Sequence, residues 1–422
     1  MIIFFKKLKE LLLRYALAGI ICIAFLIRTY VWHFSNWVGL VHHGDGYLYL
    51  AQALANGNWD KYLSHWRFMQ PVYPLYLVPI YYFNLSDSVF IFWLHQSFVA
   101  ATIILLYLSV RNFFGKSCAL AASWVYAIQL QIAYWINWTL SDMAFHFHLS
   151  LFLYLGLSCW NRINKKSLLL TSLAASLLVM TRPDGLFIVV SYSVVLLSKS
   201  LTKRFKPIFA LGISSGLVLI CSGILIGFIY FNEKSRVAIL SNIHVGWGLY
   251  TGTLPTPTNP AAVDKDLIAL FREGSHLSKI DPQGRNQWYW ASQIGLERIK
   301  NDPLGVIGIM MKRYIAVIIP SSFRDNPSWR YVLIDRFFSF YLIIGILLAV
   351  LLKNERRHLS LALLATAFSI YTLVTIYQRE WDVRVQLSSY ILLLGPSSWG
   401  WSLLYDKFFL GKRNSTTTLS NL

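Results

Sequence analysis

The segment LLLRYALAGIICIAFLIRTYVW, from Leu11 to Trp32, decides the fold class of this chain. It is long enough to cross the hydrocarbon core of a bilayer, which takes about 20 predominantly apolar residues. Runs of this kind recur along the 422 residues, at about 11–32, 88–110, 118–136, 143–160, 167–181, 184–198, 207–230, 331–352, 359–377 and 385–405. Two shorter apolar stretches, 71–84 and 304–320, are harder to place. The sequence therefore predicts an all-α polytopic membrane protein with about 10 to 12 transmembrane helices.

Composition and charge agree with this prediction. Hydrophobic residues make up 56% of the chain and charged residues only 14%, whereas a soluble protein carries about a quarter charged residues. The formal net charge of +19 could indicate nucleic-acid binding, but basic residues of membrane proteins gather on cytoplasmic loops and at anionic headgroups. We therefore expect membrane lipids and no nucleic acid as partners. The 4 cysteines are scattered singly through apolar segments without a CxxC pair, so neither a disulfide framework nor a cysteine metal site is expected.

The positions of lysine and arginine predict the sidedness. If 71–84 and 304–320 do not cross, the basic clusters at 6–14, 111–116, 162–166, 199–206, 353–357 and 407–413 share one side with both termini. That side is cytoplasmic by the positive-inside rule. The polar segments at 42–59, 137–148, 181–186, about 231–303 and 377–384 then share the opposite side. We expect a bacterial inner membrane, with these polar segments facing the periplasm.

The predicted organisation has four parts. Residues 1–230 form an N-terminal transmembrane module whose first external loop, 33–87, includes amphipathic helices. Residues 231–303 form a longer external loop region, 304–405 the C-terminal transmembrane helices, and 406–422 a cytoplasmic tail. No small-residue cleavage site follows the first apolar run, so it is expected to remain as a span.

Asp45 is placed where the chain leaves the first apolar run, in HHGDGYLYLAQALANGNW at 42–59. Partial desolvation at the lipid boundary raises the basicity of a carboxylate, so Asp45 could act as a general base on a substrate that arrives from the bilayer. The alternative is that Asp45 only caps the following helix. That helix would present one polar aromatic face with Tyr47 and Tyr49, which together with His43 are candidates for substrate binding.

A second acid, Asp142, begins the apolar helix that carries His146 and His148. Acids at a membrane boundary are costly unless they are paired or functional, so Asp142 could share one cavity with Asp45. Asp142 and His146, with a histidine of the first loop, could bind a divalent metal ion. The alternative is that Asp142 caps its helix and the histidines make interfacial hydrogen bonds.

Two arginines and two aromatic residues complete the candidate set. Arg182 opens RPDGL, where proline and glycine break an otherwise over-long helix, and a forked guanidinium beside a helix start suits a phosphate. Arg384, before the last span, could also bind phosphate, or could snorkel and pair with Asp382. Trp247 and Tyr250, among glycines of the external loop, could stack on a sugar ring or belong to an interfacial aromatic belt.

The motifs occur along the chain in the order GDGYLYLAQALANG, PVYPLYLVPIYYF, WTLSDMAFHFHLSLFLYL, TRPDGL, VGWGLYTGTLP and IKNDPLGVIGIMMKRY, followed by an external arginine before the last span. This order resembles the C-type superfamily of integral membrane glycosyltransferases, in particular the branch of protein O-mannosyltransferases and lipid A aminoarabinose transferases. The resemblance extends over about residues 11–405.

The resemblance implies a C-type glycosyltransferase fold and transfer of a sugar from a polyprenyl phosphate donor to a hydroxyl of a lipid, glycan or protein acceptor on the external face. Asp45 matches the essential acid of the family's first loop, Asp142 the acidic position of its second loop, and Arg384 its basic residue before the terminal spans. Two positions depart from the family: Gly46 stands where an acid is usual, and RVQLSSY lacks the usual aromatic residue and prolines.

In the resulting hypothesis Asp45 removes the acceptor proton, while Arg384 and Arg182 neutralise the departing phosphate. Asp142 would orient the acceptor or a divalent cation; no cofactor is certain from the sequence. One alternative is a polysaccharide polymerase or ligase that uses an undecaprenyl pyrophosphate oligosaccharide and depends on its arginines. A second is a flippase or transporter, for which related halves and charges at mid-membrane would be expected.

Overall fold

The computed structural model describes residues 2–34, 46–65, 71–129, 132–133, 136, 139–161, 165–182, 185–186, 188–193, 287–309, 329–352, 357–361, 363–364, 366–367 and 383–409. Every regular element within these ranges is a helix, as the sequence predicts. The elements are α1 (Ile2–Phe34), α2 (Tyr47–Ala55), α3 (Trp59–His65), α4 (Val72–Tyr82), α5 (Asp87–Phe114), α6 (Lys116–Ala127), α8 (Asp142–Asn161), α9 (Lys165–Thr181), α15 (Gln287–Asn301), α17 (Trp329–Leu351) and α19 (Val383–Phe409).

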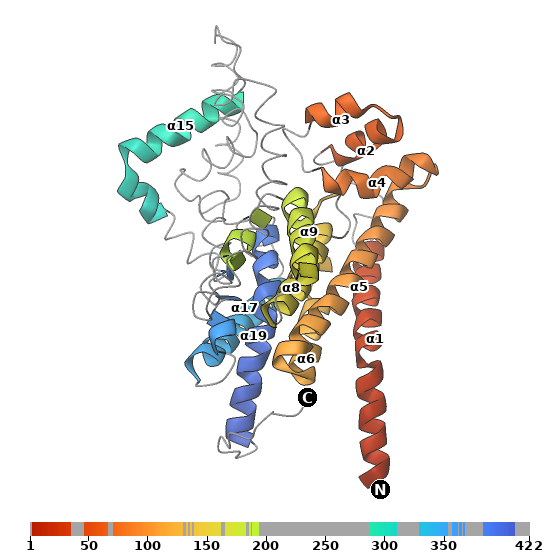
Figure 1. Cartoon of the computed structure of the whole chain (residues 1–422), viewed down its shortest axis with the longest axis vertical. Helices are drawn as coiled ribbons and strands as arrows, with labels where there is room; N and C mark the ends of the chain where they lie inside the picture. Colours follow the sequence, from red (N-terminus) through yellow and green to blue (C-terminus); the bar gives the residue numbers. More distant parts are fainter. Residues whose placement is uncertain are drawn as a thin grey trace.

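The long helices form a bundle, and the short helices α2, α3 and α4 lie together at one end of it (Figure 1). Helices α5, α6, α8 and α9 occupy the centre, with α1 on one side and the pair α17 and α19 on the other. The N-terminal end of α1, the junction of α5 and α6, and the C-terminal end of α19 lie at the end opposite to α2–α4. These three places carry basic residues: Lys6, Lys7 and Lys9; Arg111 and Lys116; and Lys407.

Two of the described helices are long and apolar enough to cross a membrane, judged by length and composition: Tyr15–His33 within α1, and Asp87–Phe114. Lys166–Thr181 and Phe337–Leu351 are shorter apolar helices. The predicted span 207–230 and parts of other predicted spans lie outside the described residues. The predicted total of spans therefore stays a prediction.

Helix α4 is too short to cross a membrane. Its 11 residues extend about 16 Å, which is about half the thickness of a hydrocarbon core of about 30 Å. It lies with α2 and α3 above the central bundle (Figure 1). Stretch 71–84, which the sequence leaves out of the predicted spans, thus forms part of the layer of short helices.

The predicted continuous helix over 118–136 is wrong, because α6 ends at Ala127. The carbonyl of Ala127 accepts a hydrogen bond from Nη1 of Arg28 at 2.9 Å, and the same nitrogen donates to the carbonyl of Ala24 at 2.9 Å. Arg28 is fully buried. Its guanidinium satisfies a carbonyl at the C-terminal end of α6, where the helix dipole favours a cation, and attaches α1 to the bundle.

Helices α17 and α19 pack with their backbones in close approach. A Cβ on Gly400 would lie 1.8 Å from the carbonyl oxygen of Gly345, and a Cβ on Gly345 would lie 2.6 Å from the carbonyl oxygen of Ser397. The hydroxyl of Ser397 donates to the carbonyl of Leu342 at 2.9 Å. Small residues at such a crossing allow the close contact on which helix association in lipid depends.

Replacing Gly400 with alanine is expected to push α19 away from α17, because the added methyl group meets backbone atoms that cannot rotate away. Overpacking of this kind costs about 1–3 kcal/mol. Thermal unfolding in detergent micelles should show a lower midpoint for Gly400→Ala. The control is Gly19→Ala in α1, where nothing lies within 4 Å of the added Cβ; equal midpoints for the two variants would contradict the prediction.

Candidate functional site

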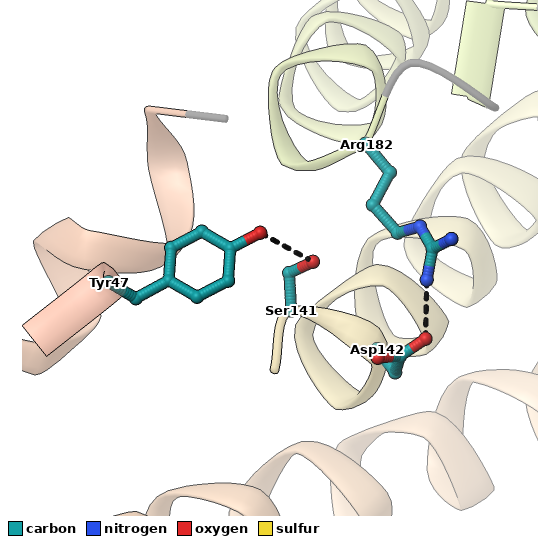
Figure 2. A network of polar contacts seen from close by, with 4 residues as sticks. All are labelled: Tyr47, Ser141, Asp142 and Arg182. Carbon is teal, nitrogen blue, oxygen red and sulfur yellow. Dashed lines mark hydrogen bonds and ion pairs between the residues drawn. The ribbon is translucent and has the colours of Figure 1, made fainter. Parts of the chain in front are cut away.

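The structure brings Asp142 and Arg182 together, two residues that the sequence singled out 40 positions apart. Nη1 of Arg182 donates a hydrogen bond to Oδ1 of Asp142, which makes a salt bridge between the start of α8 and the end of α9 (Figure 2). The side chains are 12% and 5% exposed respectively. An unpaired carboxylate is costly in such surroundings, and Arg182 provides the partner that this one needs.

Local sequence explains why these two side chains face each other. Asp142 is the first residue of α8, where a negative charge interacts favourably with the helix dipole. Helix α9 ends at Thr181, as the proline–glycine break predicts, and the carbonyl of Arg182 accepts a hydrogen bond from the backbone N–H of Gly185 at 3.0 Å. A Cβ on Gly185 would lie 2.9 Å from the backbone of Leu178, so glycine is required for this turn.

The guanidinium of Arg182 also has an aromatic contact. It lies over the ring of Phe145, with Cζ 5.5 Å from the ring centroid, and Phe145 itself is fully buried. A planar guanidinium can stack on an aromatic face and still donate from its edge. Arg182 therefore has two partners, the Phe145 ring and the Asp142 carboxylate.

Helix α2 reaches the same place through Tyr47. The Tyr47 hydroxyl donates to Oγ of Ser141 at 3.4 Å, a long hydrogen bond to the residue that precedes Asp142 (Figure 2). The Tyr47 ring packs edge to face on Tyr73 of α4, with centroids 5.0 Å apart, and is only 5% exposed. The structure thus places one predicted substrate-binding residue beside the Asp142–Arg182 pair.

Tyr49 lies on the other side of α2. Its side chain is 44% exposed, and the Lys61 ammonium lies 3.8 Å from its ring centroid. Residues two apart on an α-helix point in nearly opposite directions, so the single aromatic face predicted for Tyr47 and Tyr49 is not formed. The helix begins after Gly46, whose φ of 74° is a left-handed conformation that favours glycine.

Helix α4 is joined to the bundle by two tyrosine–histidine pairs. The Tyr73 hydroxyl lies 2.7 Å from Nε2 of His95, and Nδ1 of His95 lies 2.8 Å from the carbonyl oxygen of Ile136. The Tyr76 hydroxyl lies 2.9 Å from Nε2 of His148 on α8. Burial raises the pKa of Tyr73 well above its usual value, helped by the nearby Tyr47 and Asp142, and burial likewise raises the pKa of Tyr76. Both hydroxyls therefore remain protonated and able to donate.

The metal site considered for Asp142 and His146 also needs a histidine of the first loop, which lies outside the described residues, so this site stays a prediction. Nδ1 of His146 lies 3.2 Å from the Tyr126 hydroxyl, and the Asp142 carboxylate accepts from Arg182. No group of three or more metal-ligating His, Cys, Asp or Glu side chains occurs in the described part of the chain. In the structure His146 and His148 make hydrogen bonds, which is the alternative that the sequence left open.

Several predicted site residues cannot be placed. Asp45, His43, Trp247 and Tyr250 lie outside the described residues. Arg384 is in the first turn of α19, where the structure describes the helical backbone and not the side chain. Their proposed roles therefore stay predictions.

Sequence reasoning missed the tyrosines of α4 and the buried His95. A signal for them was present: Tyr73 and Tyr76 are three residues apart in an apolar helix too short to span, so they share one helix face. His95 is an ionisable residue within a long apolar helix, where such a residue is rare and usually has a defined partner.

No known protein-family model and no curated protein matches this sequence. Solved structures do. The archaeal oligosaccharyltransferase AglB from Archaeoglobus fulgidus, in complex with an inhibitory peptide and a dolichol-phosphate, is similar over 96% of this chain and 53% of its own, with a TM-score of 0.52 and 15% identity. The Archaeoglobus fulgidus oligosaccharyltransferase tethered with an acceptor peptide is similar over 95% of this chain and 51% of its own, with a TM-score of 0.55 and 14% identity.

This chain therefore shares the fold of the archaeal oligosaccharyltransferase. This confirms the fold implied by the sequence resemblance, with a chain that spans about half the length of the oligosaccharyltransferase. ArnT from Cupriavidus metallidurans, bound to undecaprenyl phosphate, is a further structural neighbour, with a TM-score of 0.43 and 13% identity over 93% of this chain and 78% of its own. Within this fold, the Asp142–Arg182 pair lies where the bundle meets α2 (Figure 2).

Removing one member of the pair should cost more stability than removing both. Arg182→Met leaves a buried carboxylate without its cation, which typically costs about 3–5 kcal/mol. In the double variant Asp142→Asn/Arg182→Met no unpaired charge remains, so its unfolding midpoint in detergent should exceed that of Arg182→Met alone. Additive losses in this double-mutant cycle would show that the pair is not coupled.

Proposed function

We propose that this chain is an integral membrane glycosyltransferase that moves a sugar from a polyprenyl phosphate donor to an acceptor hydroxyl at the membrane end occupied by α2, α3 and α4. The observation that carries the proposal is the Asp142–Arg182 pair, with Tyr47 beside it, at that end of a C-type glycosyltransferase fold. The similar oligosaccharyltransferase was solved with a dolichol-phosphate, which is a polyprenyl phosphate. We further propose a bacterial inner membrane and a periplasmic site, on the sidedness of the basic clusters.

The proposed chemistry needs one base and a cationic environment for the leaving group. Asp45 takes the proton of the acceptor hydroxyl, the hydroxyl oxygen forms a bond to the anomeric carbon, and the bond from that carbon to the phosphate oxygen breaks. The polyprenyl phosphate leaves with the bonding electron pair, and Arg182 and Arg384 stabilise its negative charge. Asp45 is proposed as the base from the sequence. It lies two positions before Tyr47, whose hydroxyl contacts Ser141 beside the Asp142–Arg182 pair.

The structure suggests a refined role for Asp142. In the hypothesis from the sequence, Asp142 orients the sugar acceptor or a divalent cation. In the structure its carboxylate accepts a hydrogen bond from Arg182. We propose that Asp142 holds the arginine in place for the phosphate. A guanidinium has five N–H donors, so one carboxylate oxygen does not exhaust them. Fixing a cation before the substrate arrives lowers the reorganisation needed in the transition state.

Asp45→Asn tests the proposed base. The amide keeps the shape of the side chain and cannot accept a proton at neutral pH, so transfer should fall about 10²- to 10⁴-fold. The measurement is incorporation of label from a radiolabelled lipid-linked sugar by purified protein in liposomes. Asp60→Asn is the control, because Asp60 is an exposed acid in the first turn of the neighbouring α3. A folded Asp45→Asn protein with near-normal transfer would refute the assignment.

The donor and acceptor for this assay can be identified by mass spectrometry of glycans and glycolipids from cells with and without the chain. The same assay separates the alternatives. A polymerase or ligase centred on arginines would tolerate Asp45→Ala and lose activity with Arg182→Ala or Arg384→Ala. A flippase would move a lipid-linked sugar across vesicles without forming a new glycosidic product.

A further inference from the structure

Two threonines of α9 differ in a way that bears on Arg182. Thr181, the last residue of α9, donates its hydroxyl proton to the carbonyl of Leu177 at 2.6 Å, and its Oγ1 lies 2.6 Å from Nδ1 of His148. Thr171, ten positions earlier, makes the same kind of bond to the carbonyl of Ser167 at 2.7 Å. Both threonines are buried. The histidine contact to His148 therefore distinguishes the threonine that adjoins Arg182.

These hydrogen bonds form a series, and its last acceptor, the carbonyl of Leu177, fixes the direction of each bond. A threonine hydroxyl has one proton, and Thr181 gives it to a carbonyl oxygen, which can only accept. Oγ1 of Thr181 must then accept from Nδ1–H of His148. In the neutral ring Nε2 is left as an acceptor, and it receives the Tyr76 hydroxyl proton at 2.9 Å. The bonds therefore run in one direction, from Tyr76 through His148 and Thr181 to Leu177.

We call Tyr76, His148 and Thr181 the relay, and each of the three belongs to a different helix. Tyr76 belongs to α4 in the layer of short helices, His148 to α8, and Thr181 to the end of α9. His148 and Thr181 are fully buried, and ring contact between Tyr76 and His148 adds to their hydrogen bond, with centroids 5.9 Å apart. Chains of buried hydrogen bonds strengthen one another and lock the side chains that form them.

The relay ends at the backbone that carries Arg182. Thr181 is the residue before Arg182, and the backbone N–H of Arg182 donates to the carbonyl of Leu178 at 3.1 Å, so the last turn of α9 continues into it. The same helix α8 provides Asp142, which binds the guanidinium, and His148, which fixes Thr181. Helix α8 thus contacts both the guanidinium of Arg182 and the side chain of Thr181, the residue before it.

We infer that Tyr76, His148 and Thr181 are positioning residues that hold Arg182 in place to bind the phosphate of a polyprenyl phosphate. The inference rests on the proposed function, because it takes Arg182 as a phosphate ligand. It adds three residues to the site, none of which touches the reacting atoms. It also links α4 to the position of the cation, so that the layer of short helices and the phosphate site are organised together.

The test measures binding of undecaprenyl phosphate to the full chain in nanodiscs, with undecaprenol as the probe that lacks the phosphate. Thr181→Val keeps the side-chain shape and removes the acceptor for His148. Its dissociation constant for undecaprenyl phosphate is expected to rise about tenfold, because the hydrogen bond that joins the end of α9 to His148 is lost together with the bond to Leu177. Affinity for undecaprenol should be unchanged. Thr181→Ser, which keeps the hydroxyl, should restore the affinity.

The matched control is Thr171→Val, which removes the same kind of hydroxyl-to-carbonyl bond from the same helix. It should bind undecaprenyl phosphate like the unmodified protein. A general loss of stability would reduce the amount of binding-competent protein in both valine variants without changing the dissociation constant of the remainder. If Thr181→Val does not fold, Tyr76→Phe tests the relay from its other end, with the same rise in dissociation constant expected.

Arg182→Ala separates the two levels of the proposal. If Arg182→Ala weakens binding of undecaprenyl phosphate, and Thr181→Val and Tyr76→Phe do not, the relay is overturned and the phosphate role of Arg182 stands. If the unmodified protein shows no preference for undecaprenyl phosphate over undecaprenol, or Arg182→Ala leaves that preference intact, the phosphate role of Arg182 fails and the relay inference fails with it.

Discussion

A carboxylate buried among apolar helices is costly without a partner, and in this protein Arg182 provides that partner and so joins α8 to α9. Asp142 begins one helix and Arg182 follows the other, so their salt bridge sets the two helix ends at the same end of the bundle. Hydrophobic packing alone would not do this, because lipid tails are as apolar as the side chains of a transmembrane helix. Directional polar contacts therefore define how these helices meet.

The same physical rule organises the layer of short helices. Its helices are too short to span a bilayer, and tyrosines attach two of them, α2 and α4, to polar groups of the bundle. Tyr47 reaches Ser141, Tyr73 reaches His95, and Tyr76 reaches His148. Each tyrosine combines a large apolar ring, which packs, with one hydroxyl, which must find a partner when buried. The short helices are thus held where the salt bridge lies.

Much of this could be predicted from the sequence because it depends on local properties. Runs of apolar residues predict helices, and α1, α5, α8 and α19 occur at predicted ranges. Proline and glycine predict the end of α9, and isolated acids and arginines indicate candidate site residues. The end of α6 could not be predicted, because it involves a hydrogen bond from Arg28, 99 residues away in the chain. The separation of Tyr47 from Tyr49 depends on where the helix packs, which periodicity alone does not reveal.

By itself, the sequence determined that this chain is helical and apolar and where its unusual polar residues lie, since hydropathy and turn-forming residues act over a few positions. Only the tertiary structure decided which of those polar residues meet. Asp142 meets Arg182 rather than His146, and the two α8 histidines take tyrosine partners from different helices. Such pairings arise because a buried polar group is costly without a partner, and the packing of the whole bundle decides which partner lies within reach.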